Sequence, residues 1–347
     1  MIMDASPSAS LTTVSAPTQH ESSVIWEAMV IREAIWKHAR RLAILAALAM
    51  CSESMTAQDL APRAYVISPV HSNAVTLTYS FYDGGLLLPG AIPITGATGR
   101  YNVPIFTYYH SLSMFGRSAN VTASLPYAVG HFQADVLGEP ARIYRSGLLD
   151  SSYRLSVNLK GGPAMGVPEF SKWKQKTLIG VSVRVLAPTG QYDHTKLVNW
   201  GSNRWSFKPE LGFSKRWNKI LVDAYGGAWF YTLNSAYFDH NQYIPGTQSQ
   251  SESPIGSFEG HLSYDFKSGT WVSLDGNLWF GGTTSLNGVS NPATRQVGSR
   301  IGGTGALRLS KHQSVKISYS EGTYIRYGGN YQNVSVAWQY SWRGRPK

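Results

Sequence analysis

His261 and Ser263 are the residues whose types and spacing could do chemistry. Side chains two positions apart share one face of a β-strand. A histidine beside a serine can activate its hydroxyl as the nucleophile of an acyl hydrolase, and Asp275 and Asn277 could complete the set. A lone His-x-Ser pair is nevertheless a weak motif. Its meaning depends on the strand that carries it and on which face that strand turns to lipid.

Other catalytic and cofactor motifs are missing from the sequence. It contains no P-loop, no dinucleotide-binding fingerprint and no histidine cluster with metal-ligand spacing. The one cysteine, Cys51, excludes a disulfide framework and a cysteine-based metal site. Gly302 to Gly305 lie within a predicted strand, where glycine signals close backbone approach rather than phosphate binding. We therefore expect no cofactor, no metal and no enzymatic activity.

Composition favours β-structure and argues against a nucleic-acid binder. The chain has 20 Tyr, 12 Phe, 11 Trp and 34 Gly but only 15% charged residues, which is unlike a helical enzyme. The mean hydropathy of −0.19 suits a barrel in which every second strand residue faces water. The net charge of +11 is spread singly among strands and turns, so it offers no footprint for a phosphate backbone.

The N-terminal region contains an export signal. Basic residues from Lys37 to Arg41 precede the short apolar run 42–50, and Ala57 is a small residue at the expected cut. The run is too short to span a bilayer as a helix. We predict a leader and cleaved signal peptide over 1–57, in which residues 1–36 precede the basic region and the working start is Met29. Cys51 leaves a lipoprotein signal as an alternative.

Twelve segments of the mature chain alternate apolar and polar residues with period two, the pattern of a strand with one apolar and one polar face. In the last segment Val334, Val336 and Trp338 share one face. Many segments have about the 9 to 11 residues that a tilted strand needs to cross a bilayer. The predicted strands are 74–82, 102–112, 119–126, 148–159, 177–187, 205–217, 220–231, 258–266, 270–280, 300–309, 314–326 and 331–342.

The connections between these segments differ in length. Tight links such as Asn218-Lys219 and 267–269 alternate with long links rich in Gly, Pro, Asn and Ser, such as 83–101 and 232–257. Short turns on one rim and long loops on the other are typical of transmembrane barrels. The link 160–176 is an exception on the short side. The sequence thus predicts an all-β fold, a transmembrane antiparallel up-and-down β-barrel of about twelve strands, over residues 74–342.

A soluble β-sandwich or lipocalin-like barrel would also alternate, but its apolar face would point inward. In a membrane barrel the apolar residues face lipid, and the polar partners face the lumen. Leu262, Tyr264 and Phe266 then take the lipid face, so His261 and Ser263 point away from lipid substrates. The predicted lumen-lining residues are Arg154, Arg184, Lys208, Glu210, Arg216, Asp223, Trp229, Glu259, His261, Asp265, Asp275, Trp279, Arg300 and Arg308.

The predicted lumen lining has two interpretations. Its charges can form cross-strand ion pairs that hold the wall together, with Glu210 within reach of Arg184. They can also shape a permeation path, because rings of charge select solutes by sign and size. Most tryptophans near strand ends belong to interfacial girdles. By parity, Trp229 and Trp279 point inward and could line an apolar pocket.

Three stretches of sequence resemble a known family. The runs 149–165, 187–217 and 330–342 are similar to the outer-membrane β-barrel family of the MetA-pathway of phenol degradation, and Ala-Pro-Thr-Gly-Gln-Tyr-Asp after the fifth strand is the most specific mark. The resemblance extends over nearly all of residues 60–342. It implies a porin-like or transporter-like protein without established catalytic residues. The end RGRPK, residues 343–347, departs from the terminal aromatic of the usual assembly signal.

We predict an outer-membrane channel or transporter for passive or facilitated uptake of small solutes, aromatic or hydrophobic ones among them. The alternatives are a plugged structural or adhesive barrel with binding loops and, as a minor one, a lipid hydrolase that uses His261 and Ser263. The expected partners are outer-membrane lipid, the barrel-assembly machinery and small-molecule solutes, with no nucleic acid. Residues 58–73 include Pro62 and Pro69 and are not strand-like, so we expect this segment to fold into the lumen as a small plug.

Overall fold

The computed structural model of the chain describes residues 60–87, 94–136, 138–196, 198–241, 244–267 and 269–344. The chain divides into two units, Met1–Leu42 and Ala43–Lys347, and all described residues belong to the second. The predicted leader, the signal peptide with its cleavage site and the last three residues of the tail lie outside the described residues. Within the described ranges, no helix is long and apolar enough to cross a membrane.

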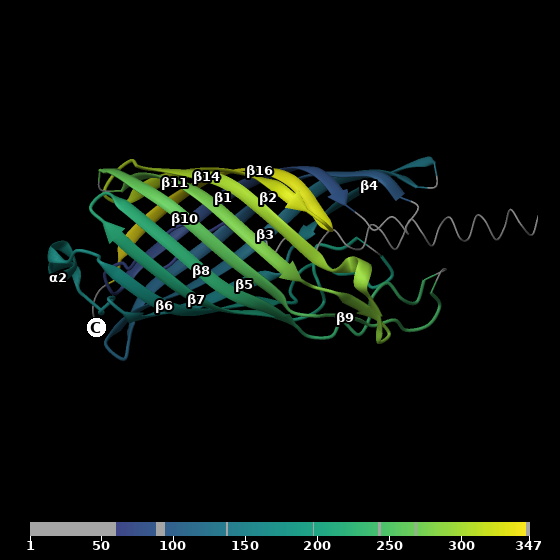
Figure 1. Cartoon of the computed structure of the whole chain (residues 1–347), viewed down its shortest axis with the longest axis horizontal. Helices are drawn as coiled ribbons and strands as arrows, with labels where there is room; N and C mark the ends of the chain where they lie inside the picture. The colour runs from purple at the N-terminus through teal and green to yellow at the C-terminus, as the bar shows by residue number, and fades with distance from the viewer. Residues whose placement is uncertain are drawn as a thin grey trace, which may run out of the picture. The chain divides into compact units, whose positions relative to one another are not determined.

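One antiparallel sheet dominates the described residues and closes on itself into a barrel (Figure 1). Its strands are β1 (Ser72–Leu87), β2 (Ile94–Met114), β3 (Arg117–Val136), β4 (Glu139–Leu148), β5 (Ser151–Lys160), β6 (Thr177–Ala187), β7 (Ser206–Trp217), β8 (Ile220–Tyr231), β10 (Ile255–Lys267), β11 (Thr270–Gly281), β14 (Gln296–Arg308), β15 (Gln313–Ile325) and β16 (Gly328–Arg343). Because β4 and β5 both pair with β3, they form the two halves of one wall strand. The described wall therefore has twelve strands.

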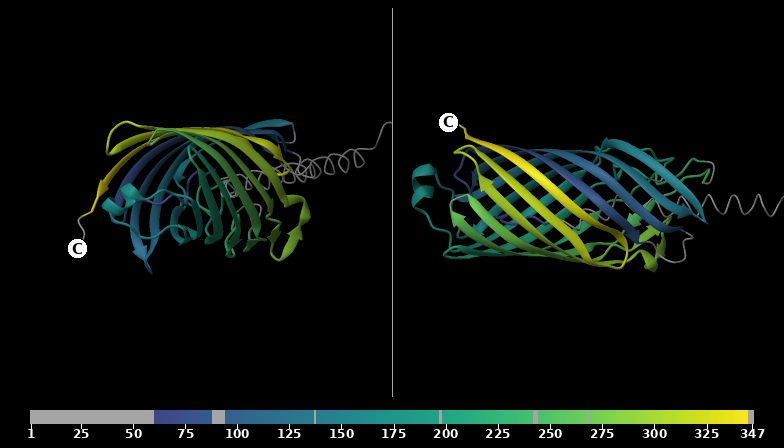
Figure 2. Two further views of the ribbon diagram at one scale, coloured as in Figure 1. Left: turned by 60° about the vertical axis from the view of Figure 1, so that its left-hand side comes forward. Right: turned by 90° about the horizontal axis from the view of Figure 1, so that it is seen from above.

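Neighbouring wall strands follow one another along the chain, and β1 pairs with β16 to complete the circle. Figure 2 shows these strands running obliquely around the barrel. This is the predicted antiparallel up-and-down barrel, and each of the twelve predicted segments corresponds to a wall strand. The fold prediction is confirmed.

The two faces of each wall strand differ in exposure, as β11 illustrates. The side chains of Leu274 and Leu278 are both 57% exposed. The residues that follow them, Asp275 and Trp279, are 2% and 1% exposed. Large apolar residues thus cover the outside of the barrel, and polar residues turn inward. A soluble barrel would show the opposite arrangement. The outer belt is the surface that a bilayer solvates.

Several strands are longer than the alternation predicted. The long loops expected over 83–101 and between residues 127 and 147 are largely strand, because β1, β2, β3 and β4 keep pairing beyond the apolar belt. Glycine and polar side chains in these stretches suggested loops. The backbone N–H and C=O groups of each strand nevertheless find partners on the next strand, so the ladder continues.

Tight turns join strands at the rim that holds residue 344. Phe115 and Gly116 join β2 to β3, and Asn218 and Lys219 join β7 to β8; the first three of these residues have positive φ. The exceptional link 161–176 contains the short helix α2 (Val167–Lys172). It folds back over the first turn, since Ala164 N donates to Gly116 O at 3.0 Å. The link therefore covers the turn between β2 and β3.

The other rim carries the longer links. Within the described residues, β9 (Gln250–Glu252), β12 (Thr284–Leu286) and β13 (Val289–Asn291) form a small separate sheet there, followed by the 3₁₀ turn η2 (Pro292–Thr294). Two connections here are short, since only residues 137–138 lie between β3 and β4 in the sequence and only residues 326–327 lie between β15 and β16. This rim therefore supplies most of the irregular chain that can cover the barrel mouth.

A charge on the outer belt should destabilise the protein in a bilayer. We expect Leu274→Arg to lower the free energy of unfolding from lipid vesicles by about 2 to 4 kcal/mol, since the guanidinium would enter hydrocarbon. Denaturant titration followed by tryptophan fluorescence measures the change.

Val289→Arg is the matched control, because Val289 is 74% exposed but lies on β13, outside the barrel wall. It should leave the free energy of unfolding unchanged. Equal stability of the two variants in vesicles would contradict the assignment of the outer face to lipid.

Candidate functional site

The inner face of the wall carries a network of buried charges centred on Lys208 of β7. Its Nζ lies 2.8 Å from Glu210 Oε2 and 3.0 Å from Glu259 Oε1 of β10. Gly227 of β8 lies between these strands, and a Cβ there would come within 3.2 Å of Lys208 Cε. Glycine thus leaves room for the lysine to reach across β8. A buried cation between two carboxylates stays charged without the water it has lost.

A second group of polar residues continues the network around the wall. His261 Nδ1 of β10 lies 2.8 Å from Asp275 Oδ1 of β11. The same carboxylate accepts hydrogen bonds from Ser273 Oγ and Thr304 Oγ1, each at 2.6 Å. His261 Nε2 lies 3.7 Å from Glu259 Oε2, which links the two groups. Charges of both signs are therefore held by one another across several strands.

The segment 60–71 lies against this inner face, and Tyr65 is its most buried side chain. Gly180 of β6 and Gly212 of β7 are register partners, and their missing side chains leave space that the ring of Tyr65 occupies. A Cβ at Gly180 would lie 2.4 Å from Tyr65 Cδ1, and one at Gly212 would lie 2.1 Å from Cε2. The Tyr65 hydroxyl lies 3.0 Å from Ser182 Oγ and donates to Glu210 Oε1 at 3.0 Å.

Arg63 fixes the same segment to other wall strands. Its guanidinium lies 2.8 Å from Asp265 Oδ1 of β10, and Asp265 also pairs with Arg216 of β7. The Arg63 guanidinium stacks over the ring of Trp271 on β11 at 4.2 Å, and the Arg63 backbone N–H donates to Asp223 Oδ2 at 3.3 Å. The segment is thus held by side chains from four neighbouring strands, β7, β8, β10 and β11.

Backbone groups of the segment also bond to the wall. Ala64 N donates to the Tyr225 hydroxyl at 3.1 Å, and Arg154 donates to Ala64 O at 3.3 Å. Ala61 N donates to Glu259 Oε2 at 3.4 Å. At the far end, Val70 N donates to Met165 O of the link that carries α2, at 2.9 Å. The contacts are therefore distributed along the segment.

A cavity of about 550 Å³ lies beyond the segment, inside the barrel. Leu60 and Ala61 line one part of it. The wall contributes hydroxyl-bearing residues and the charged side chains of Arg184 and Asp275, and Trp229 adds an aromatic surface. A volume of this size can enclose a small organic molecule. Polar groups together with aromatic rings suit a solute that has both an apolar body and a hydrogen-bonding group.

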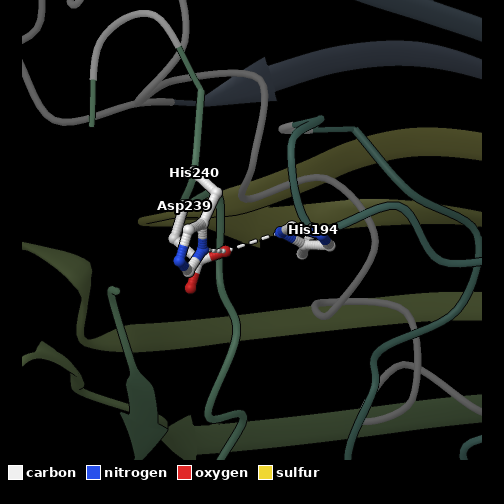
Figure 3. A group of neighbouring side chains, drawn as sticks. All are labelled: His194, Asp239 and His240. Carbon is white, nitrogen blue, oxygen red and sulfur yellow. Dashed lines mark hydrogen bonds and ion pairs between the residues drawn. The ribbon is translucent and has the colours of Figure 1, made fainter. Parts of the chain in front are cut away.

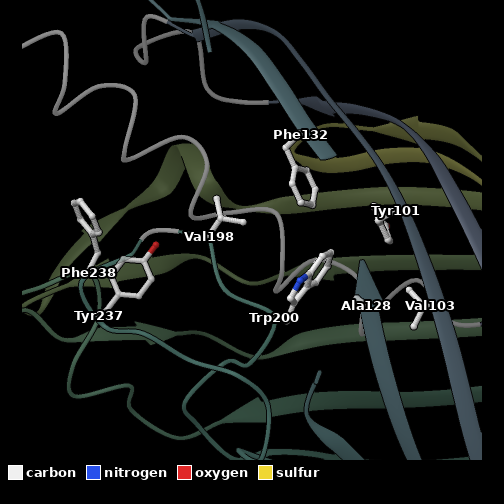
Figure 4. Packing of buried hydrophobic residues seen from close by; sticks show 8 residues of the cluster. All are labelled: Tyr101, Val103, Ala128, Phe132, Val198, Trp200, Tyr237 and Phe238. Atoms are coloured by element: carbon white, nitrogen blue, oxygen red, sulfur yellow. The ribbon is translucent and has the colours of Figure 1, made fainter. Parts of the chain in front are cut away.

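An aromatic cluster packs the link between β6 and β7 against the extended parts of β2 and β3 (Figure 4). Trp200 of this link lies against Tyr101 of β2 and Phe132 of β3, with ring centroids 5.8 and 5.7 Å apart. The same cluster includes Tyr237 and Phe238 of the link between β8 and β10. Trp200 also lines the cavity, so the two links belong to a cluster that contributes to the cavity lining.

Most of the sequence-predicted site residues are on the buried inner face. Lys208, Asp223, Trp229, Glu259, His261, Asp275, Trp279 and Arg300 are buried, and the side chains of Arg154 and Glu210 are at most 10% exposed. Arg184, Arg216 and Asp265 are partly exposed, and Arg308 is exposed at a strand end. The sequence predicted that Glu210 would reach Arg184; the structure pairs Glu210 with Lys208 and Arg154. Sequence reasoning did not identify Arg63 and Tyr65 as site residues. The inward glycines of β6 and β7 were a signal that another part of the chain packs closely against these strands.

Trp229 and Trp279 both point inward, as parity indicated, and pack with Ile255 and Ile325. Trp229 lines the cavity. Trp279 instead covers a wall glycine, since a Cβ at Gly298 would lie 2.3 Å from its ring. The indole N–H groups of both tryptophans are buried without a hydrogen-bond partner among the described residues.

The geometry of the His-x-Ser pair does not support hydrolysis. Ser263 is buried and faces inward, and among the described residues its hydroxyl has no hydrogen-bond partner. His261 is instead directed to Asp275 and Glu259. A nucleophilic serine needs a base within hydrogen-bond reach and access to its substrate. Both residues belong to the polar packing of the wall.

Known structures share this architecture. The crystal structure of an outer membrane channel from Pseudomonas putida F1 is similar with a TM-score of 0.66 at 16% identity, and covers 82% of this chain and 100% of that chain. The transport unit of the autotransporter AIDA-I from Escherichia coli gives 0.46 at 12% identity, over 88% and 98% of the two chains. The KdgM porin gives 0.40 at 8% identity, over 78% and 99%. No curated protein sequence matches the chain.

A family model also matches the sequence. It is described as the MetA-pathway of phenol degradation, and it covers residues 92–342, which include the wall from β2 to β16. This chain belongs to the family of the MetA-pathway of phenol degradation, with the fold of an outer-membrane channel.

Proposed function

We propose that the protein is a channel in the bacterial outer membrane for the uptake of small solutes that have an aromatic or hydrophobic body and a polar group. The observation that carries this proposal is the cavity of about 550 Å³ inside a closed barrel, lined by hydroxyl groups, charges and Trp229. A wall that served only as an anchor would need no such space, because its interior could be filled by side chains.

The cavity lining suggests how a solute is held. The Trp229 side chain is 1% exposed and its indole N–H has no partner among the described residues, so a solute that displaced a neighbouring side chain would reach a donor for its hydroxyl or carboxylate oxygen. The ring offers a flat apolar surface to an aromatic body. Arg184 adds a positive charge to the same cavity, which favours a neutral or anionic polar group over a cation.

We also infer that the segment 60–71 restricts the passage. It occupies the inner face between the cavity and the rim with the tight turns, and it is held there by Tyr65 and Arg63. These contacts are noncovalent and lie outside the barrel ladder. Displacing the segment would leave the wall intact, so the segment sets the resting conductance.

The channel proposal is tested with the purified chain in planar bilayers and in liposomes. Small ions and phenol should cross at measurable rates, and liposomes should swell in isosmotic solutions of small solutes but not of large oligosaccharides. An inserted, correctly folded barrel that passes neither ions nor solutes would overturn it and would favour a structural barrel.

Releasing the segment 60–71 should raise the conductance. We expect the double variant Arg63→Ala, Tyr65→Ala to conduct several times more than the parent, because it lacks the Asp265 ion pair and the ring that fills the glycine gap. Tyr153→Ala is the control, since Tyr153 is 48% exposed on the outer face of β5. An unchanged conductance in the double variant, with both proteins inserted equally well, would argue against the segment as the restriction.

Solute binding at Trp229 is measured by fluorescence. Phenol should quench part of the tryptophan emission in a saturable way, and Trp229→Phe should remove most of that saturable part because it removes the fluorophore that lines the cavity. Trp205→Phe, a tryptophan 46% exposed outside the barrel wall, should keep it. Quenching that rises linearly with phenol and is equal in all three proteins would contradict binding in the cavity.

A further inference from the structure

Two histidines and an aspartate from separate links meet at the rim that carries the longer links (Figure 3). His194 lies between β6 and β7, while Asp239 and His240 lie between β8 and β10. His194 Nδ1 is 2.7 Å and His240 Nδ1 is 3.2 Å from Asp239 Oδ1. One ligand atom from each residue lies within 4.8 Å of the other two. We propose that these three residues form a zinc site that joins the two links.

The donor set matches zinc chemistry. Two imidazole nitrogens and one carboxylate oxygen are ligands that zinc binds in tetrahedral sites, and three protein ligands leave a fourth position for water. Tetrahedral zinc at ordinary bond lengths places its ligand atoms about 3.3 Å apart, close to the spacings in this cluster. Zinc would lie between Asp239 and the two Nδ1 atoms, and each neutral imidazole would bind it through Nδ1 and keep its one proton on Nε2.

The three residues are positioned by contacts outside the cluster. Asp239 N donates to His194 O at 2.9 Å, which fixes the two links to each other. Asp239 Oδ2 accepts a hydrogen bond from Gln248 N at 3.2 Å, so Oδ1 is left to face the histidines. Partners of this kind orient metal ligands in known sites. The arrangement is therefore set before a metal arrives.

The backbone around Asp239 is an independent observation. Phe238 and His240 have φ angles of 45° and 51°, in the left-handed region that non-glycine residues seldom adopt. Strained residues persist where the surroundings impose them, and they cluster at functional sites. In an extended chain, consecutive side chains would point to opposite sides. The positive φ angles instead direct His240 back to the carboxylate of the residue before it.

Access to the cluster is also suitable for an ion. The Asp239 side chain is fully buried, while the side chains of His194 and His240 are 46% and 54% exposed. The carboxylate therefore lies at the buried side of the cluster, and the two imidazoles lie at its solvent-exposed side. A metal could enter without unfolding either link.

The site has a consequence for the cavity. Trp200 and Val198 follow His194 in one link, and Tyr237 and Phe238 precede Asp239 in the other; these four belong to one aromatic cluster. Because Trp200 lines the cavity, zinc bound at the site would hold together the two links that pack around this lining residue. This inference does not depend on which solute the barrel carries.

The experiment measures zinc binding to the untagged, EDTA-treated barrel in detergent. Isothermal titration with zinc chloride should give one zinc per chain. His194→Gln and His240→Gln, each with an exposed side chain, should weaken binding about tenfold or more, and Asp239→Asn should do the same where it folds. Cobalt added in place of zinc should give the intense visible absorption of a tetrahedral site, which the variants should lack.

His131→Gln is the matched control, because His131 is another exposed histidine, on β3, packed against Tyr144. It should bind zinc like the parent. Proteolysis gives a second measurement, since zinc should slow cleavage within the links 188–205 and 232–249 in the parent but not in His194→Gln. Absence of stoichiometric zinc binding, or equal affinity in the parent and both histidine variants, would overturn the proposal whatever the conductance of the barrel.

Discussion

Hydrogen bonding of the backbone in a medium without water is the constraint on which this structure depends. Hydrocarbon offers no partner to a peptide N–H or C=O group, so each strand must be paired on both sides and the sheet must close. The pairing of β1 with β16 meets this requirement along all sixteen residues of β1. The belt of exposed apolar side chains follows, because the outer surface of a closed wall is solvated by lipid alone.

Closure also creates an interior that must be filled or hydrated. The chain meets this need with charges that neutralise each other across strands, as Lys208 does between Glu210 and Glu259. It further inserts the segment 60–71, whose backbone groups bond to Tyr225 and Arg154. What remains is the cavity beside Trp229. Stability of the wall and the shape of the proposed pathway therefore depend on the same side chains.

Period-two alternation was enough to predict the wall, because every wall strand has an apolar outer face and a polar inner face. It failed at 83–101, where β1 and β2 keep pairing beyond the apolar belt and apolar alternation is no longer required. The inward direction of Lys208 and Trp279 followed from parity alone. Their partners did not, since Glu259 lies 51 residues from Lys208 in the sequence and reaches it only through the curvature of the wall.

The cluster of His194, Asp239 and His240 shows a different limit of prediction from sequence. No histidines stand at metal-ligand spacing in the sequence, so the sequence predicted no metal site. His194 and Asp239 are 45 residues apart and belong to different links. Which links meet is decided by aromatic packing of Trp200 with β2 and β3, a contact that no local pattern encodes.

The glycine pair under Tyr65 has a consequence for related sequences. Gly180 and Gly212 face each other on neighbouring strands, and neither position has space for a methyl group while the ring of Tyr65 is in place. A relative that carries alanine at either wall position must therefore have lost the ring at the position of Tyr65 or moved it elsewhere. These three positions should covary, and an alignment in which they change together would record how the interior of the barrel has been reshaped during evolution.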